Sequence, residues 1–291
     1  MATPAPYNQP VPELPEVETI ARGVHQRVLH AQILSAWFSR YREPMKTPPR
    51  QQQNALTGAW FLSVRRVGKH IVCDLATQPP TPDTTHHAPT HQWIVHLGMT
   101  GRLVVTHADQ PIVPHTHARL PLHDGREIRF VDARRFGCLE LLDLRKQPAF
   151  HGPGSEPMTI SAEDFARLFQ SRKVAIKAAL LNQSLLHGVG NIYADESLFR
   201  AGIRPRRLAA SLTRAQLERL RVSLQQVLTH AIALGGSSVS DYVDANGVRG
   251  FFQLEHCVYA RQGMPCRICG QPIQRIVLAG RGTHFCCQCQ R

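Results

Sequence analysis

Four cysteines near the C-terminal end of this 291-residue chain place the strongest constraint on its fold. The segment CRICGQPIQRIVLAGRGTHFCCQC holds Cys266 and Cys269, then residues 270–285, then Cys286 and Cys289, so each pair encloses two residues. Pairs with this spacing bind zinc through four thiolates in a tetrahedral site. Because protein occupies all four positions, the sequence predicts one structural zinc ion, which stabilises a hairpin too small to bury a core of its own.

Cys287 is an alternative ligand, although only Cys286 preserves the paired spacing. Five of the eight cysteines lie in the last 26 residues. A disulfide framework would spread more widely and is typical of smaller secreted chains, so the clustering favours metal. The first residues lack the pattern of a signal peptide, and no run of about 18 apolar residues occurs. We therefore expect a cytoplasmic protein.

The chain carries a large excess of positive charge. Lys and Arg number 34 against 21 Asp and Glu, which gives a formal net charge of +13. Such an excess favours a polyanionic partner, and nucleic acid is preferred to a membrane because no basic amphipathic anchor is evident. A soluble protein that is merely basic is the alternative that charge alone leaves open.

The first half of the chain has the pattern of one helix followed by strands. Val17, Ile20 and Val24 recur at helical spacing, which predicts a helix over residues 16–30. Residues 76–92, rich in Pro, Thr and His, predict an exposed hairpin insertion without an assigned role. Runs rich in β-branched and aromatic residues, separated by Gly, Pro and Asp, predict strands over residues 33–39, 60–68, 70–75, 92–99, 102–105, 127–132 and 138–144.

After residue 150 the pattern changes to helices. Ser161 with Asp164, and Thr213 with Gln216, are signals that begin a helix. The last 40 residues return to strand-like sequence around the cysteines. The expected helices cover residues 161–169, 173–183, 193–201 and 213–234. This order predicts an α+β fold with a β-rich domain, a helical domain and a small C-terminal segment that a metal ion stabilises.

Several motifs occur in an order that identifies a family. They are PELPEVET, GKH, HLGMTGRL, DARRFG, GVGNIYADESLFRAGI and the terminal cysteine hairpin. Over residues 11–291 the chain resembles bacterial formamidopyrimidine-DNA glycosylase, a bifunctional enzyme that removes 8-oxoguanine and ring-opened purines. The related endonuclease VIII branch usually has Gly after the first Pro-Glu, and Leu14 at that place favours the purine-specific branch.

The resemblance implies a particular α+β architecture. An N-terminal β-sandwich with a leading helix precedes a helical helix-two-turns-helix domain and a C-terminal zinc-finger β-hairpin. The boundaries that we expect are 1–11 for a disordered or mis-annotated N-terminal extension, 12–147 for the β-sandwich catalytic domain, 148–250 for the helix-two-turns-helix domain that binds DNA, and 251–291 for the zinc-finger hairpin.

The chemistry requires a nucleophile for C1′ of the damaged nucleotide. By resemblance Pro12 is that nucleophile, Glu13 is a proton donor and Glu16 is a supporting carboxylate. Lys69 is assigned proton donation in β-elimination and Arg281 is assigned to δ-elimination. Without the resemblance, the two glutamates would simply favour a helix N-terminus, and Lys69 and Arg281 would be solvated.

The position of Pro12 raises a question about the start of the chain. The amine of an N-terminal proline can form an iminium ion, whereas the nitrogen of an internal proline is a tertiary amide and cannot. We therefore expect Val11 to mark the true start, read by initiator methionine that is then removed before Pro12. Residues 1–10, which are Pro-rich and lack a hydrophobic pattern, would be an artefact or a removable leader.

Contacts with DNA are also implied by the resemblance. Met99 and Phe136 match the wedge that fills the space of an everted base, and Arg134 matches the arginine that faces the estranged cytosine. Two departures from the family pattern occur: Ser-Val-Ser at residues 238–240 in the damaged-base loop, and Ala133 in place of a common proline. The remaining implied contacts with DNA are His115, Lys173, Lys177 and Asn191.

The function that these motifs imply is a DNA glycosylase and AP lyase of base excision repair. It excises oxidised purines through an N-terminal proline Schiff base followed by β,δ-elimination. The expected partner is double-stranded DNA that contains oxidised purines. We expect the protein to be a monomer in the cytoplasm, associated with the bacterial nucleoid, and to contact no membrane. We expect it to need no organic cofactor. The alternatives are an endonuclease VIII-like glycosylase for oxidised pyrimidines, or a noncatalytic zinc-containing protein that binds damage if Pro12 stays internal.

Overall fold

The computed structural model describes residues 11–80, 88–238 and 250–291, which form two compact units. Unit 1 is built mainly from Glu16–His151, and unit 2 from Gly152–Gly236 and Phe251–Arg291, together with Glu13–Pro15. The N-terminal extension up to residue 10, the centre of the 76–92 insertion and most of the damaged-base loop lie outside the described residues.

Helix α1 (Leu14–Val28) leads the chain into unit 1. It begins two residues earlier than the pattern predicts, because the fixed φ of Pro15 suits the first turn of a helix. It ends two residues earlier than predicted, and His30 beyond it has a left-handed φ of 61°. The apolar face of α1, including Val17 and Val24, is buried.

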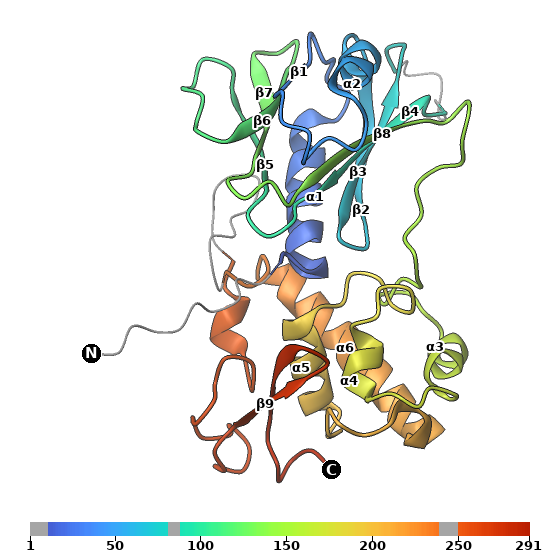
Figure 1. Cartoon of the computed structure of the whole chain (residues 1–291), viewed down its shortest axis with the longest axis vertical. Coiled ribbons are helices and arrows are strands. Elements are labelled where there is room, and N and C mark those ends of the chain that lie inside the picture. Colours follow the sequence, from blue (N-terminus) through green and yellow to red (C-terminus); the bar gives the residue numbers. More distant parts are fainter. Residues whose placement is uncertain (1–10, 81–87, 239–249) are drawn as a thin grey trace. The chain divides into compact units, whose positions relative to one another are not determined.

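Unit 1 contains two antiparallel four-stranded sheets, ordered β1-β6-β7-β5 and β2-β3-β4-β8. Both sheets and α1, which runs beside them in Figure 1, contribute side chains to one hydrophobic core. The expected β-sandwich with a leading helix is therefore confirmed. The strands are β1 (Trp37–Phe38), β2 (Trp60–Val67), β3 (His70–Ala76), β4 (His91–His96), β5 (Arg102–His107), β6 (Thr116–Pro121), β7 (Arg126–Val131) and β8 (Cys138–Asp143).

Two elements of unit 1 were not predicted: strand β6 and helix α2 (Pro49–Leu56). The α2 sequence PRQQQNAL has no apolar period, and among its residues only Gln52 and Leu56 are buried. The Gln52 side chain accepts a hydrogen bond from the Trp93 indole and donates one to the Thr47 carbonyl. The helix is thus held by tertiary polar contacts, which a hydrophobic pattern does not reveal.

Unit 2 is mostly helical and ends in a two-stranded hairpin (Figure 1). The Ser161 hydroxyl accepts from the Asp164 N–H, and Thr213 and Gln216 form a reciprocal capping box, so both predicted helix starts are confirmed. The elements are α3 (Ala162–Phe169), α4 (Ile176–Leu180), α5 (Asn191–Arg200), η1 (Ala209–Ser211), α6 (Arg214–Ala233), η2 (Phe252–Glu255), β9 (Gln274–Leu278) and β10 (Arg281–Phe285).

The helix expected over residues 173–183 is wrong in length. Residues before Ile176 are extended: Ala175 forms an isolated bridge with Leu208, and the Ala209 N–H donates to the Val174 carbonyl. Helix α4 is therefore short, and turns connect it to α5 in the helix-two-turns-helix arrangement. Within the described part of the chain, no helix is long and apolar enough to cross a membrane.

Candidate active site and zinc centre

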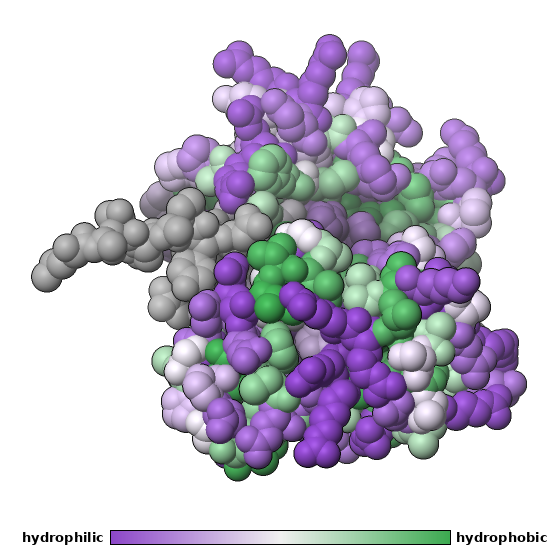
Figure 2. All heavy atoms as spheres, turned by 60° about the horizontal axis from the view of Figure 1, so that its bottom comes forward, coloured by the Kyte–Doolittle hydropathy of each residue, from purple (hydrophilic) through white to green (hydrophobic). Residues whose placement is uncertain are grey.

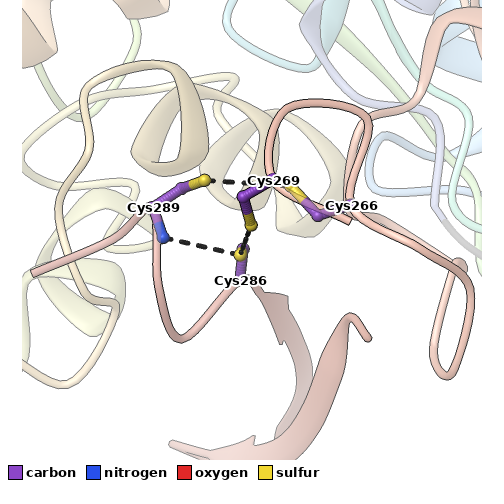
Figure 3. Close-up of side chains that lie close together, drawn as sticks. All are labelled: Cys266, Cys269, Cys286 and Cys289. Atoms are coloured by element: carbon purple, nitrogen blue, oxygen red, sulfur yellow. Dashed lines mark hydrogen bonds between the residues drawn. The ribbon is translucent and has the colours of Figure 1, made fainter. Parts of the chain in front are cut away.

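The four predicted zinc ligands lie together in unit 2 (Figure 3). All four Sγ atoms lie within 4.8 Å of one another. The Cys266–Cys289 distance is 3.9 Å and the Cys269–Cys286 distance is 3.4 Å. A tetrahedral zinc ion with Zn–S bonds of about 2.3 Å separates its sulfurs by about 3.8 Å, so the donor set fits zinc. Cys286, and not Cys287, belongs to the cluster, as the spacing predicts.

The hairpin beside this cluster presents Arg281. Strands β9 and β10 are joined by Ala279 and Gly280, whose φ angles are 49° and 70°. Two successive positive φ angles define the type I′ turn, which matches the twist of a hairpin. Arg281 follows the turn directly and its side chain is exposed.

Glu13 is buried against the N-terminus of α5. Its side chain accepts hydrogen bonds from the N–H groups of Ile192 at 3.1 Å and Tyr193 at 3.4 Å. A β-carbon on Gly190 would lie 2.1 Å from the Glu13 carboxyl carbon, so only glycine allows this approach. The unpaired N–H groups of a helix N-terminus favour a carboxylate there. Glu13 therefore caps α5 and does not merely favour its own helix.

Glu16 lies in unit 1 and has a different partner. Its carboxylate accepts a hydrogen bond of 2.7 Å from the Ser237 N–H, and its side chain is buried. Ser237 directly follows the Gly235–Gly236 stop of α6 and precedes the damaged-base loop. Glu16, the supporting carboxylate that the resemblance implies, thus holds the residue directly before the damaged-base loop.

Lys177 is fully buried in unit 2. Its ammonium lies 2.7 Å from Asp195 and donates to the Gly282 carbonyl and the Thr283 hydroxyl. Burial lowers the pKa of Lys177, and the neighbouring Asp195 carboxylate opposes that shift. A phosphate contact would require the ammonium to leave Asp195. The DNA-binding role of Lys177 therefore stays a prediction, and the structure shows a contact that holds the hairpin next to Arg281.

Asn191 makes a similar contact. Its side-chain amide donates to the Gly282 carbonyl at 3.0 Å. The Asp195 carboxylate accepts from the His284 N–H at 2.8 Å, so α5 binds β10 at two places. Both residues implied as phosphate ligands, Lys177 and Asn191, instead reach the backbone of the zinc hairpin in this structure.

Lys177→Ala is expected to lower the free energy of unfolding by about 3–5 kcal/mol, because it leaves the Asp195 charge buried without its partner. Lys173→Ala is the matched control, since the exposed Lys173 side chain is expected to contribute less than about 0.5 kcal/mol. Denaturant unfolding measures both. Unchanged stability in Lys177→Ala, with a salt dependence of DNA binding reduced by about one charge, would instead establish a phosphate contact.

Lys69 lies in the two-residue turn that joins β2 and β3. Val67 pairs with His70 across the turn, and Gly68 has a φ of 60°. Glycine at the first central position is typical of a type II′ turn. The GKH motif therefore places Lys69 at the tip of a short hairpin of unit 1, where its side chain is partly exposed.

The implied DNA contacts of unit 1 lie on three loops. Phe136 is 57% exposed, and the Arg134 guanidinium lies 4.9 Å from the centre of its ring. Met99 is partly buried, and His115 is exposed with a left-handed φ of 63°. The exposure of the Phe136 ring suits the wedge role, which stays a prediction.

Two acidic residues of α5 were not singled out in the sequence. Asp195 has the contacts described above, and the Glu196 carboxylate accepts from the N–H groups of residues 257–259 at 2.8–2.9 Å. Burial raises the pKa of Glu196, and these N–H groups act against that shift. The signal was present in NIYADESLF: adjacent acidic residues inside a helix that is otherwise buried need partners.

The surface of unit 2 is rich in polar side chains. The exposed side chains include Arg172, Lys173 and Arg206. The segment of Arg172 and Lys173 pairs with the segment that follows Arg206, since the Ala210 N–H donates to the Arg172 carbonyl. Figure 2 shows hydrophilic residues over much of the face that it presents, with hydrophobic ones scattered between them. A surface of this kind suits a charged partner more than an apolar one.

Three family models match the chain in order. "Formamidopyrimidine-DNA glycosylase N-terminal domain" matches residues 11–139, "Formamidopyrimidine-DNA glycosylase H2TH domain" matches residues 152–243, and "Zinc finger found in FPG and IleRS" matches residues 263–291. Proteins named formamidopyrimidine-DNA glycosylase from Solibacter usitatus and Desulfitobacterium hafniense are each 43% identical to this chain. They align over their whole lengths with 97% and 96% of it.

Solved structures give the same result. MutM (Fpg) from Thermus thermophilus is 38% identical, with a TM-score of 0.80 over 96% of this chain and 98% of its own. A complex of Lactococcus lactis Fpg with Fapy-dG containing DNA is 32% identical, with a TM-score of 0.81 over 96% of this chain and all of its own.

The fold and the four-cysteine site define a zinc-finger enzyme of DNA repair with a helix-two-turns-helix domain. The expected fold class and the structural zinc ion are thereby confirmed. The chain belongs to the formamidopyrimidine-DNA glycosylase family.

Proposed function

We propose that Pro12 is the nucleophile with which this chain excises oxidised purines from double-stranded DNA and then cuts the strand. Membership of the family makes the chain a DNA glycosylase for oxidised purines, and lyase activity is typical of that family. The substrate class is supported by the full-length likeness to a Lactococcus lactis enzyme that was solved with Fapy-dG containing DNA. A second complex of that protein contains an abasic site, the product of base excision.

The first step forms a bond between the Pro12 nitrogen and C1′. The glycosidic bond breaks, its electron pair leaves with the base, and the base takes up a proton. The nitrogen then loses its own proton, and its lone pair forms the C=N bond of an iminium ion as the C1′–O4′ bond opens; O4′ keeps the electron pair of that bond and takes up a proton. Since the N–H groups of α5 hold the adjacent Glu13, we assign the proton transfers at this centre to Glu13, and Glu16 supports the segment that begins at Ser237.

The second step cuts the strand. The iminium ion acidifies the C2′ proton; its removal expels the 3′ phosphate by β-elimination, and δ-elimination then releases the 5′ phosphate. Lys69 on its hairpin tip is assigned to the first elimination and Arg281 at the start of β10 to the second. Lys69 is a cation on a tight turn and Arg281 a cation directly after one, a placement that suits contact with phosphate.

Binding of the duplex is assigned to the exposed side chains of both units. Met99 and Phe136 would fill the space of the everted nucleotide, and Arg134 would face the estranged base. His115, Lys173 and Asn191 would contact the backbone, and the buried Lys177 would do so after its ammonium leaves Asp195. We further propose that the protein acts as a monomer in the cytoplasm, at the bacterial nucleoid.

Borohydride reduction tests this function, because it traps the iminium ion as a stable adduct. With protein that begins at Pro12, we expect a covalent protein–DNA adduct on a duplex that contains 8-oxoguanine opposite cytosine. A duplex that contains thymine glycol is the control. An adduct with thymine glycol alone would support the endonuclease VIII-like alternative, and binding to 8-oxoguanine DNA without any adduct would support a noncatalytic protein that recognises damage.

A further inference from the structure

Three loops of unit 1 meet at one buried carboxylate. Asp132 is 0% exposed, and it lies just beyond β7 at the start of the DARRFG motif. The loops are those that carry Met99, His115 and the pair Arg134 and Phe136. Asp132 itself has been assigned no contact with DNA, and its burial excludes one.

The Asp132 side chain joins two of these loops. It accepts from the Thr100 hydroxyl at 2.5 Å and from the Gly137 N–H at 2.7 Å. The Arg134 N–H lies 3.3 Å from the carboxylate and 3.2 Å from the Thr100 hydroxyl oxygen. Thr100 follows Met99 directly, and Gly137 follows Phe136. The carboxylate is thus bonded to the neighbours of both wedge residues.

The Asp132 backbone reaches the third loop. Its N–H donates to the His115 carbonyl at 2.9 Å, and its carbonyl lies 3.0 Å from the His117 ring nitrogen Nε2. The other His117 ring nitrogen lies 3.0 Å from the Ser39 hydroxyl. His115 is therefore fixed at the position where its backbone takes a left-handed φ.

The wedge loops leave each other no free space. A β-carbon on Gly98, beside Met99, would lie 2.4 Å from the Phe136 carbonyl carbon. Arg135, between Arg134 and Phe136, has a left-handed φ of 57°. Such a conformation is strained at a non-glycine residue and persists only where the surroundings hold it. The hydrogen bonds to Asp132 supply that support on both sides of Arg135.

We propose that Asp132 is the positioning residue for opening the duplex, because it holds Met99, His115, Arg134 and Phe136 in one arrangement before DNA binds. This inference rests on the proposed function. Inserting a wedge must offset the free energy of unstacking at each base step. Ordering a side chain on binding adds an entropic cost, and a loop that is already ordered avoids this cost.

Asp132→Asn tests the proposal, because the amide turns an N–H donor toward either the Gly137 N–H or the Arg134 N–H. We expect excision from 8-oxoguanine:cytosine duplex under single-turnover conditions to slow by at least about 10-fold, since misplaced groups lose rate steeply. Cutting at a preformed abasic site, where no damaged base must be unpaired, is expected to change by less than about 3-fold. The ratio of the two rates is the readout.

Two further variants separate positioning from folding. Thr100→Val removes the hydroxyl that joins the Met99 loop to Asp132, and we expect the same selective loss; Thr100→Ser keeps the hydroxyl and is expected to restore the rate. Asp124→Asn is the matched control. Asp124 lies in the turn between β6 and β7, and within the part of the chain that the structure describes it accepts hydrogen bonds only from Arg126. It is expected to leave both rates unchanged.

The outcomes distinguish this inference from the proposed function. Wild-type protein that begins at Pro12 and cuts neither substrate would refute the proposed function itself. If the wild type cuts both, equal losses on both substrates, or no loss in either Asp132→Asn or Thr100→Val, would overturn the positioning role. Should Asp132→Asn fail to fold, the comparison of Thr100→Val with Thr100→Ser decides the question.

Discussion

A chain that begins at Pro12 is expected to be trapped by borohydride on 8-oxoguanine DNA, and a chain that retains residues 1–11 is expected not to be. The reason is electronic. The α-amine of an N-terminal residue has a pKa near 8, so a usable neutral fraction exists at physiological pH. Inside a chain the proline nitrogen is an amide whose lone pair is delocalised. The expected loss of adduct exceeds about 10³-fold, the scale of losing a catalytic nucleophile.

The measurement compares two forms of the protein, with the N-terminal mass of each determined before trapping. The full chain is one form, and the other has initiator methionine directly before Pro12. The family match begins at residue 11, so the shorter form keeps the matched region from Pro12 onward. Equal zinc content and equal unfolding midpoints serve as the control. Efficient trapping by protein whose mass includes residues 1–11 would refute Pro12 as the nucleophile.

Cys269→Ala is expected to abolish δ-elimination through loss of the zinc ion. The residues around the metal bury only a small cluster, namely Phe199, Val258, Cys266, Ile273 and Cys286. Structural zinc contributes about 10–16 kcal/mol in isolated zinc fingers, far more than so small a cluster can replace. Without the ion, the turn that carries Arg281 loses its support, and δ-elimination should fail first.

Elemental analysis and product analysis test this expectation together. Wild-type protein should contain one zinc ion per chain, and Cys269→Ala should contain none. Cys287→Ala is the matched control, because Cys287 lies beside two ligands and outside the four-sulfur cluster. It should keep both zinc and activity. Zinc loss from Cys287→Ala, or full cutting by zinc-free Cys269→Ala, would contradict this account of the site.

Features that depend on neighbours in sequence were predicted well. The paired cysteines identified the metal site, because two residues between ligands already bring their sulfurs close. The capping signals at Ser161 and Thr213 located the starts of α3 and α6 for a similar reason, since a cap bonds groups only three residues away. The leading helix and the strands with strong alternation also followed from local pattern.

Features that depend on partners distant in the sequence were not predicted. Helix α2 has no local pattern, and it forms because Gln52 reaches Trp93. The helix expected over residues 173–183 is shortened by pairing with residues around Leu208. The partners of Glu13 lie about 180 residues away along the chain, and the hairpin partners of Lys177 lie about 105 residues away. No sequence period operates at such distances.

By itself the sequence determined the family, the zinc ligands and the α+β order of the domains, because motifs and spacing carry that information. Only the tertiary structure decided what the charged residues do within each unit. It placed Glu13 on the N-terminus of α5, paired Lys177 with Asp195, and joined three loops at Asp132. The reason is that a buried charge must find a partner, and which partner it finds is set by the packing of elements that are remote in sequence.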